Sequence, residues 1–303
     1  MTLALLCSGQ GRQDRAILDL FIDDPRAVPI LAEASTLLGQ DIRTLLSQAP
    51  DSALFANRTS QILCVTRGLI AAACLAPTAP FFTAGSSVGE MTAWGVAGIW
   101  SPERTLRLTA VRAEAMNTAS GADDGLGFVR GLAREHVQAL VTRFDCAIAI
   151  INPDLVLVIG GERRQVERCC TAALGEGAAA ARPIAVHVAS HTPRLAAAVA
   201  VFREQLDGSE PGRPTRGRTL IGAADSSIVR GASGVAGLAE QIATTIDWAA
   251  TLEALVERGV DRVLELGPGT ALADMMRARY PMVEARCVDD FRSQTGITDW
   301  LAR

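Results

Sequence analysis

Short apolar runs alternate along the chain with longer segments in which apolar residues repeat at helical spacing. The runs that predict strands cover residues 2–7, 81–84, 218–222, 263–266 and 285–288. The segments that predict helices cover residues 26–38, 57–76, 102–116, a stretch that ends near 206, and 234–258, which has the pattern of two helices. Strands that alternate with helices predict an α/β fold, in which 263–266 is a buried parallel strand and 285–288 an edge strand.

The pattern changes after a polar, glycine-rich turn at residues 121–125. The segments that follow are strand-like at 126–130, helix-like at 133–143, strand-like at 146–151 and 155–160, helix-like at 162–174 and strand-like at 183–188. This β-α-β-β-α-β order is the ferredoxin-like pattern. We therefore expect a large α/β-hydrolase-like domain with a parallel sheet, residues 1–123 and 189–303, into which a small ferredoxin-like subdomain, residues 124–188, is inserted.

The turn after the run 81–84 combines small residues with a serine. Gly85, Ser87 and Gly89 fit Gly-x-Ser-x-Gly, and a helical pattern follows at once. In a nucleophile elbow, small flanking residues let the backbone turn tightly enough to present the central serine at the head of a helix. Ser87 is therefore the candidate nucleophile. The alternative is structural, because serine also caps the amino ends of many helices.

The composition of the 303-residue chain excludes several classes of protein. Its net charge of −4 lacks the basic surplus of a general nucleic-acid-binding protein. No apolar run approaches the ~18 to 20 residues of a membrane span, and the first residues have no basic leader. We therefore expect a cytoplasmic protein that binds neither nucleic acid nor membrane.

The basic residues and the cysteines limit the chemistry further. All 29 basic residues are arginine, so the chain has neither a P-loop lysine nor a lysine for a Schiff base with pyridoxal phosphate. The cysteines form no ligand array and lie mostly in apolar stretches, so we expect reduced core residues and neither metal nor cofactor. They are Cys7, Cys64, Cys74, Cys146, Cys169, Cys170 and Cys287.

Three histidines are available as a general base for Ser87. His136 lies in an amphipathic helix of the expected insert, where we expect it to be solvated. His187 alternates with valines in a strand-like segment. His191 lies at a strand-to-helix junction, a position from which a polar side chain can point across a cleft, and is the best candidate base.

Motifs spread along nearly the whole chain resemble those of the malonyl-CoA:acyl-carrier-protein transacylases in order and spacing. They are Gly9-Gln10-Gly11-Arg12-Gln13, Gly85-Ser86-Ser87-Val88-Gly89-Glu90, Val111-Arg112-Ala113-Glu114-Ala115-Met116, Ser190-His191, Gln241 followed by Trp248, and Glu265-Leu266-Gly267-Pro268-Gly269. The segments 7–11, 93–98 and 289–293 look most like the epsilon subunit of malonate decarboxylase. Several motifs in register are much more specific than any one of them.

The resemblance implies an acyl transfer in two steps. Ser87, deprotonated by His191, would attack the thioester of malonyl-CoA, and the thiol of a carrier protein would then attack the malonyl-serine ester. Backbone N–H groups of Val88 and Gln10 would form the oxyanion hole. The backbone carbonyl of Gln241 would orient His191, so that no acid is needed in that place.

The resemblance also implies which residues bind the substrate. Arg112 matches the arginine that pairs with the free carboxylate of malonate, and its planar fork suits a bidentate carboxylate. The alternative is an exposed helix arginine paired with Glu114. Asn152 matches a family asparagine, although the Pro-Asp-Leu-Val run after it departs from the usual sequence. Two more departures are Ser86, where histidine is usual, and Ser8, where proline is frequent.

Three functions remain open from the sequence. The first is malonyl transfer from malonyl-CoA to an acyl-carrier protein, either the carrier subunit of malonate decarboxylase or a fatty-acid or polyketide carrier. The second is a serine thioesterase or hydrolase with the same Ser-His pair and an acid such as Asp145 or Asp154. The third is a non-catalytic subunit that docks a carrier protein.

Overall fold

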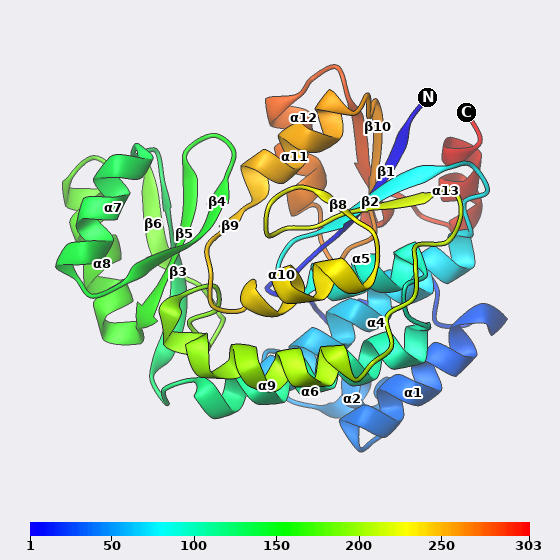
Figure 1. Ribbon diagram of the computed structural model, residues 1–303, viewed down its shortest axis with the longest axis horizontal. Helices are drawn as coiled ribbons and strands as arrows, with labels where there is room; N and C mark the ends of the chain where they lie inside the picture. The colour runs from blue at the N-terminus through cyan, green and yellow to red at the C-terminus, as the bar shows by residue number, and fades with distance from the viewer.

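The computed structural model describes residues 1–303 and has two sheets with helices packed around them (Figure 1). The first sheet has the strand order β11-β10-β1-β2-β7-β8. All its neighbouring strands are parallel except the pair β7 and β8. The strands are β1 (Leu3–Cys7), β2 (Phe81–Gly85), β7 (Arg218–Ile221), β8 (Ile228–Val229), β10 (Arg262–Glu265) and β11 (Glu284–Cys287). The α/β fold with a parallel sheet is therefore confirmed.

Helices cover this sheet and extend below it in the view of Figure 1. They are α1 (Val28–Leu38), α2 (Ile42–Gln48), α3 (Asp51–Leu54), α4 (Asn57–Leu75), α5 (Gly89–Ala97), α6 (Pro102–Ala119), α9 (Ala196–Asp207), α10 (Val235–Glu240), α11 (Trp248–Glu257), α12 (Ala271–Arg279) and α13 (Gln294–Leu301). Short 3-10 helices are η1 (Pro25–Ala27), η2 (Pro193–Leu195), η3 (Ala232–Gly234) and η4 (Val288–Asp290). Helix α6 begins as the sequence predicts, with Ser101 accepting a hydrogen bond from the Arg104 amide and proline in the first turn.

A second sheet, at the left of Figure 1, has the strand order β6-β3-β5-β4-β9. Its elements are β3 (Asp124–Arg130), α7 (Arg134–Arg143), β4 (Ala147–Asn152), β5 (Val156–Glu162), α8 (Arg163–Gly175), β6 (Ala180–Pro183) and β9 (Ile246–Asp247). The predicted β-α-β-β-α-β order is present. The fifth strand, β9, lies in the part of the chain that follows the expected insert. It pairs in parallel with β4. The division into a large domain and a ferredoxin-like subdomain stays a prediction.

The predicted strand at 183–188 is wrong. Strand β6 ends at Pro183, opposite Gly127 of β3, and the segment after it is a loop that exchanges two backbone hydrogen bonds with Leu126 of β3: the Ile184 amide donates at 3.0 Å and the Val186 carbonyl accepts at 3.4 Å. Val186 is nevertheless buried, in a small cluster with Leu126 and Ala149. The apolar alternation therefore comes from side chains that cover the sheet surface, which looks like strand alternation in sequence. His187 accordingly lies in a loop.

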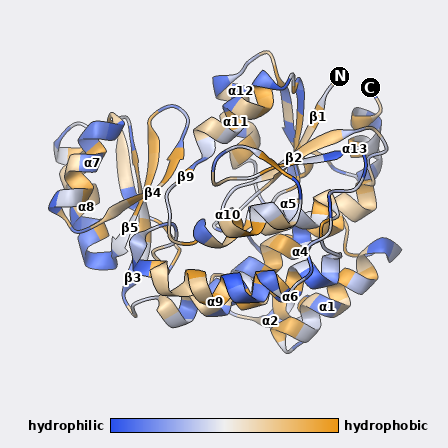
Figure 2. Ribbon diagram, in the orientation of Figure 1, coloured by the Kyte–Doolittle hydropathy of each residue, from blue (hydrophilic) through white to orange (hydrophobic).

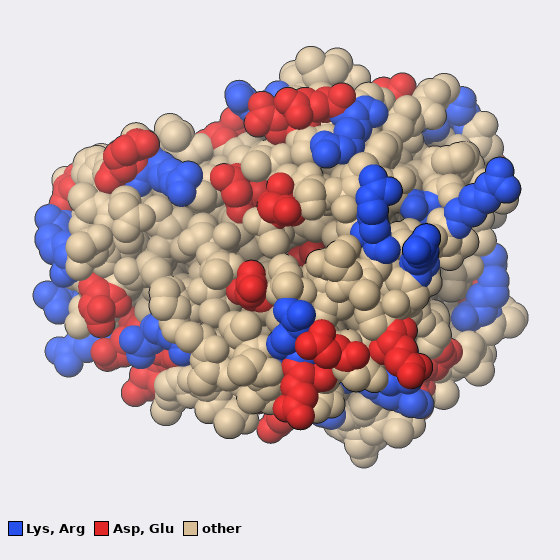
Figure 3. Space-filling view, in the orientation of Figure 1, with Lys and Arg blue, Asp and Glu red and all other residues tan.

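The apolar side chains form one large core around the first sheet and a smaller one between the second sheet and helices α7 and α8. In Figure 2 the strands are mainly orange, whereas blue residues mark α6, α7 and α8. Figure 3 shows arginine and acidic side chains interspersed over one face. None of the helices combines the length and the apolar character needed to cross a membrane.

Strands β1, β2 and β10 are neighbours and run in the same direction, so their carboxyl ends lie at one edge of the sheet. The register aligns Cys7 with Gly85, and Leu6 with Glu265. Three loops thus begin side by side there: residues 8–11, the elbow 86–88, and residues 266–270. Open α/β sheets commonly bind ligands at this edge.

Candidate active site

The backbone between β2 and α5 makes the sharp turn that the glycine pattern predicts. Ser87 has φ +57°, a left-handed conformation that costs energy for any residue with a Cβ. Side chains at the flanking glycines would not fit, since a Cβ on Gly85 would lie 2.1 Å from the Gly89 carbonyl oxygen. A Cβ on Gly89 would lie 2.0 Å from the Cys7 carbonyl oxygen. The turn therefore presents Ser87 at the head of α5, as in a nucleophile elbow.

His191 contacts Ser87 from the loop that leaves the second sheet. Its Nε2 atom lies 2.7 Å from the Ser87 Oγ, and its Nδ1 atom lies 2.6 Å from the backbone carbonyl oxygen of Gln241. A carbonyl only accepts hydrogen bonds, so the proton of a neutral imidazole must be on Nδ1. Nε2 is then free to accept the Ser87 hydroxyl proton.

The surroundings of His191 keep the imidazole neutral. The ring is buried, and this burial lowers its pKa from 6.5 to about 3. The positive charge of Arg112 lowers the pKa further, whereas the hydrogen bond to Gln241 opposes the shift. At neutral pH the side chain is thus in the form that can act as a base.

Two backbone N–H groups beside Ser87 have no acceptor within the protein. These belong to Val88, directly after the serine, and to Gln10, in the loop after β1. The two loops lie close together, since a Cβ on Gly9 would be 3.0 Å from the Ser86 carbonyl oxygen. Unpaired amides that converge near a serine are suited to hold an oxyanion.

A cavity of about 180 Å³ lies beside Ser87 and His191. Its wall includes Gln10, Ser87, Asn152 and His191, and side chains of the second sheet such as Val158 close the other side. Asn152, at the end of β4, is therefore brought to the same cavity as the serine and the histidine. Ser86 also lines it, in the place where the resembling family usually has histidine.

Arg112 lies within α6 and has no solvent-exposed surface. Its two terminal nitrogens donate to the side-chain oxygens of Gln61, at 2.7 Å, and Gln241, at 3.1 Å. Its Nε is buried without a partner. The interpretation as an exposed arginine paired with Glu114 is wrong. Burial lowers the pKa of Arg112 to about 10, which leaves the guanidinium charged at neutral pH.

Gln241 contacts three of the residues predicted for the site, Ser87, His191 and Arg112. Its backbone oxygen contacts His191, its side-chain oxygen contacts Arg112, and its side-chain nitrogen lies 3.2 Å from the Ser87 carbonyl oxygen. The same nitrogen donates to Glu90. Arg112 does not itself line the cavity, but one residue holds it beside the Ser87–His191 pair.

The sequence predictions missed three polar residues of this region: Gln61, Glu90 and Glu265. Glu265 is fully buried, and it accepts hydrogen bonds from the Ser8 hydroxyl at 2.7 Å and the Ala273 amide at 2.8 Å. Ser8, in place of a frequent proline, thus ties the first loop to β10. The position of Glu265 inside an apolar run could have identified it as a buried residue. A buried carboxylate needs hydrogen-bond donors around it.

The remaining candidates lie elsewhere. His136 is on the surface of α7 and pairs with Glu176, as an amphipathic helix predicts. His187 Nδ1 accepts a hydrogen bond from Arg163 at 2.7 Å and does not reach Ser87. Neither Asp145 nor Asp154 bonds to His191, whose Nδ1 is occupied by Gln241. No three His, Cys, Asp or Glu side chains are grouped as metal ligands.

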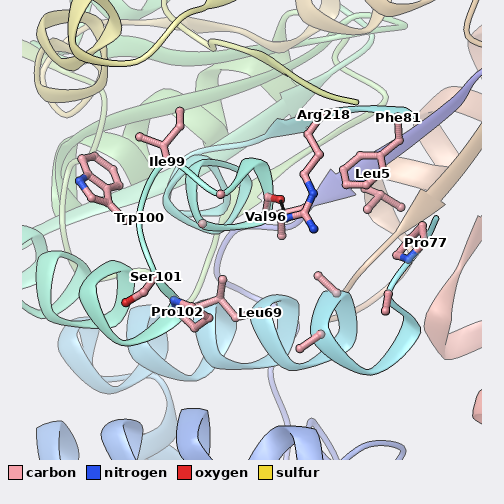
Figure 4. A pocket seen from close by; sticks show the side chains of 15 residues that line it. Leu5, Leu69, Pro77, Phe81, Val96, Ile99, Trp100, Ser101, Pro102 and Arg218 are labelled. Carbon is pink, nitrogen blue, oxygen red and sulfur yellow. Dashed lines mark hydrogen bonds between the residues drawn. The ribbon is translucent and has the colours of Figure 1, made fainter. Parts of the chain in front are cut away.

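A larger cavity, of about 460 Å³, lies near the opposite ends of β1 and β2 (Figure 4). Apolar side chains such as Leu69 and Phe81 line most of it. Its one charged side chain, Arg218, donates to the Val96 carbonyl oxygen at 2.8 Å. None of the predicted site residues lines it, whereas several of them line the smaller cavity.

Comparisons with known proteins show which family the chain resembles over nearly its whole length. The model of the acyl transferase domain family matches residues 5–287. The polyketide biosynthesis protein ThaF of Burkholderia thailandensis is 30% identical over 99% of this chain, which spans only 26% of that protein. The malonyl CoA-acyl carrier protein transacylase of Haemophilus influenzae is 27% identical over 98% of both chains. A malonyl-transacylase solved in complex with a type II polyketide acyl-carrier protein superposes with a TM-score of 0.91, at 28% identity and 99% coverage of both chains.

Proposed function

The chain belongs to the acyl transferase domain family and is an acyltransferase, and we propose that it transfers a malonyl group from malonyl-CoA to the thiol of an acyl-carrier protein. The transfer would proceed through a malonyl ester of Ser87. The relatives named as malonyl CoA-acyl carrier protein transacylases support the choice of donor and acceptor. The complex of a malonyl-transacylase with an acyl-carrier protein supports a protein as the acceptor.

In the first step, His191 Nε2 accepts the hydroxyl proton of Ser87 while the Oγ attacks the thioester carbonyl carbon. The resulting tetrahedral intermediate collapses as the carbon–sulfur bond breaks. The CoA sulfur leaves with the proton from the imidazolium. Ser87 then carries the malonyl group as an ester, and His191 is neutral again.

In the second step the carrier thiol replaces the serine. His191 takes the thiol proton, the sulfur attacks the ester carbonyl, and the carbon–oxygen bond to Ser87 breaks. The proton returns to Ser87 Oγ. The enzyme ends in its starting state, and the carrier holds a malonyl thioester.

We assign the oxyanion of both tetrahedral intermediates to the amides of Val88 and Gln10. Their lack of protein acceptors supports this assignment. Removing one such donor typically costs on the order of 3 kcal/mol of transition-state stabilisation. Asn152, in the wall across the cavity, would contact the acyl group.

The observation that carries the choice of malonyl is the buried guanidinium of Arg112, held beside the reacting pair by neutral amide oxygens only. A buried cation without a directly paired anion is costly. A free carboxylate on the acyl group would supply the missing charge and the missing acceptor for Nε. Acetyl and other neutral acyl groups cannot do so, and this favours malonyl.

The hydrogen-bond partner of His191 Nδ1 argues against the hydrolase alternative. Serine hydrolases usually place a carboxylate at the second nitrogen of the histidine. Here the neutral carbonyl of Gln241 occupies that nitrogen. No observation in the structure favours a carboxylate from Asp145 or Asp154.

Intact-mass measurement tests the proposal. Wild-type protein mixed with malonyl-CoA should gain one malonyl group, and the group should leave when a carrier protein with a free thiol is added. Ser87→Ala should gain none, whereas the neighbouring Ser86→Ala serves as the matched control and should still be acylated. Rapid release of free malonate without a carrier would favour the hydrolase, and absence of any adduct would favour a docking subunit.

The finer proposal is that the carrier is the subunit of malonate decarboxylase that bears a dephospho-CoA-type arm. It rests on the resemblance of the segments 7–11, 93–98 and 289–293 alone. Offering acylated enzyme to carriers with this arm and with ordinary phosphopantetheine would decide it. Faster transfer to the phosphopantetheine carrier would favour a fatty-acid or polyketide carrier. A cytoplasmic location likewise stays a prediction.

A further inference from the structure

The side chain of Gln241 lies between a buried cation and a buried carboxylate. Its oxygen accepts a hydrogen bond from Arg112 at 3.1 Å, and its nitrogen donates to Glu90 on α5. Arg112 and Gln241 are at most 1% exposed, and Glu90 is 2% exposed. The two charges are thus separated by a single amide group, out of contact with water.

The partners of Gln241 leave its amide only one orientation. Arg112 can only donate hydrogen bonds, so it requires the amide oxygen. Glu90 and the Ser87 carbonyl oxygen accept hydrogen bonds from the amide nitrogen, at opposite sides of the same group. If the amide were rotated by half a turn, its N–H groups would face the guanidinium. Arg112, Glu90 and the Ser87 carbonyl oxygen together determine that the Gln241 oxygen faces Arg112.

Glu90 is also the only carboxylate that acts on the charge of Arg112. Burial lowers the pKa of Arg112, and Glu90 is the group that raises it. Both oxygens of Glu90 accept from N–H donors, one from Gln241 and the other from the Ala223 amide at 3.1 Å. Burial raises the pKa of Glu90, and the hydrogen bonds from Gln241 and Ala223 oppose this shift because they favour the ionised carboxylate.

The second hydrogen-bond partner of Arg112, Gln61, is otherwise connected only to uncharged side chains. Gln61 accepts from Arg112, and its own nitrogen donates to Asn57 at 2.8 Å. Asn57 also receives a hydrogen bond from the Gln10 side chain at 3.4 Å. This side of the guanidinium is held by a series of neutral amides. Charge compensation comes from the Gln241 side alone.

We propose that Glu90 and the side chain of Gln241 are positioning residues that hold Arg112 oriented for a free carboxylate without occupying it. This inference rests on the proposed malonyl transfer and names the part of the site that sets its specificity. A carboxylate in direct contact with Arg112 would form a buried ion pair and compete with the substrate. An amide placed between the two charges compensates the cation and leaves Nε, which has no partner, for the substrate carboxylate.

The test exchanges the two side chains. In Glu90→Gln, the Gln241 nitrogen faces a neutral amide in place of the carboxylate, so Arg112 loses the negative charge that lies behind Gln241. In the double variant Glu90→Gln with Gln241→Glu, the number of buried charges is unchanged, but the carboxylate now contacts Arg112 directly. The measurements are calorimetric affinities for free malonate and free acetate, and the ratio of kcat/KM for malonyl-CoA to that for acetyl-CoA.

We expect wild-type protein to prefer malonate, and we expect the preference to fall at least about tenfold in E90Q and further in the double variant. A preference within about twofold of wild type in both would overturn the inference. Asp124→Asn removes another buried carboxylate, one paired with Arg194 at 2.8 Å, and is the matched control that should keep the preference. If E90Q does not fold, the double variant, whose charges are conserved, decides.

The two proposals fail separately. Binding of free malonate requires no transfer, so wild-type protein that prefers malonate but forms no malonyl-serine would contradict the proposed function alone. Wild-type protein that transfers malonyl while E90Q and the double variant keep its selectivity would contradict only the role of Glu90. An equal loss for malonyl-CoA and acetyl-CoA in E90Q would show a merely structural role and overturn the inference.

Discussion

His191 donates a hydrogen bond from Nδ1 to the backbone carbonyl oxygen of Gln241 across 2.6 Å. A carboxylate in this position would stabilise the imidazolium strongly, whereas a neutral carbonyl orients the ring and stabilises the charge less. The ring is also buried next to the positive Arg112. Burial and the charge of Arg112 both favour the neutral form of His191, which suits its proposed role as a base.

Removing the imidazole should slow acylation while the fold is kept. We expect His191→Ala to lower the rate of malonyl-serine formation about 10²- to 10⁴-fold, because general-base catalysis contributes that much. Rapid-quench intact mass measures this rate, and circular dichroism checks the fold. His136→Ala, on the surface of α7, is the matched control. A normal rate in His191→Ala would move the base to another residue.

Arg112 should decide which acyl group is transferred. We expect Arg112→Ala to lower kcat/KM for malonyl-CoA at least about 100-fold and to keep or improve that for acetyl-CoA. Arg112→Lys should not restore malonyl transfer, because an ammonium lacks the planar fork. Arg107→Ala removes an exposed arginine of the same helix, one paired with Glu33, and should change neither. Equal malonyl activity in Arg112→Ala would refute the assignment.

The pH dependence of acylation should show no titration near the usual pKa of histidine. Since the pKa of His191 is lowered to about 3, the base stays unprotonated, and the single-turnover acylation rate should be flat from about pH 8 to pH 5. A fall in rate centred near pH 6.5 would contradict this. The same lowered pKa implies that His191 contributes less to stability as the pH falls below about 6.5, where the unfolded chain takes up the proton.

Glu265 should make the folded state less stable as the pH rises through the weakly acidic range. Burial raises its pKa from 4.5 to about 7, so between these values the folded chain binds a proton that the unfolded chain has lost. We expect a loss of roughly 3 kcal/mol of unfolding free energy from pH 4.5 to pH 7 from this group. Urea unfolding of wild type and Glu265→Gln at several pH values measures it. Parallel pH profiles for the two proteins would contradict the prediction.

Much of the fold followed from local patterns. The strands β1, β2, β7, β10 and β11 lie within a residue or two of their predicted positions, since fully buried parallel strands form continuous apolar runs. The predictions missed β8, β9 and the helices α2, α3, α12 and α13. A strand of two residues, such as β9, has no period, and only its pairing with β4 identifies it. The apolar residues at 183–188 led to a wrong strand prediction. A loop whose side chains pack on a sheet shows the same alternation of apolar residues as a strand within the sheet.

The candidate site was predictable where a residue type is required locally. Gly85 and Gly89 must be glycine, because backbone atoms lie about 2 Å from the position that a Cβ would take. The glycine spacing therefore predicts the elbow around Ser87. The roles of Ser87, His191 and Arg112 came from motifs and stay predictions. The structure adds that these side chains lie together, although 104 positions separate Ser87 from His191.

The sequence by itself determined the main parallel strands, the tight turn at Ser87 and the absence of lysine chemistry, because each depends on neighbouring residues or on composition alone. Only the tertiary structure decided which polar groups share a buried space. Gln241 contacts His191, Arg112, Glu90 and the Ser87 backbone at once. Such convergence depends on how distant segments pack at one edge of a sheet. A pattern along the chain does not show which distant residues come into contact.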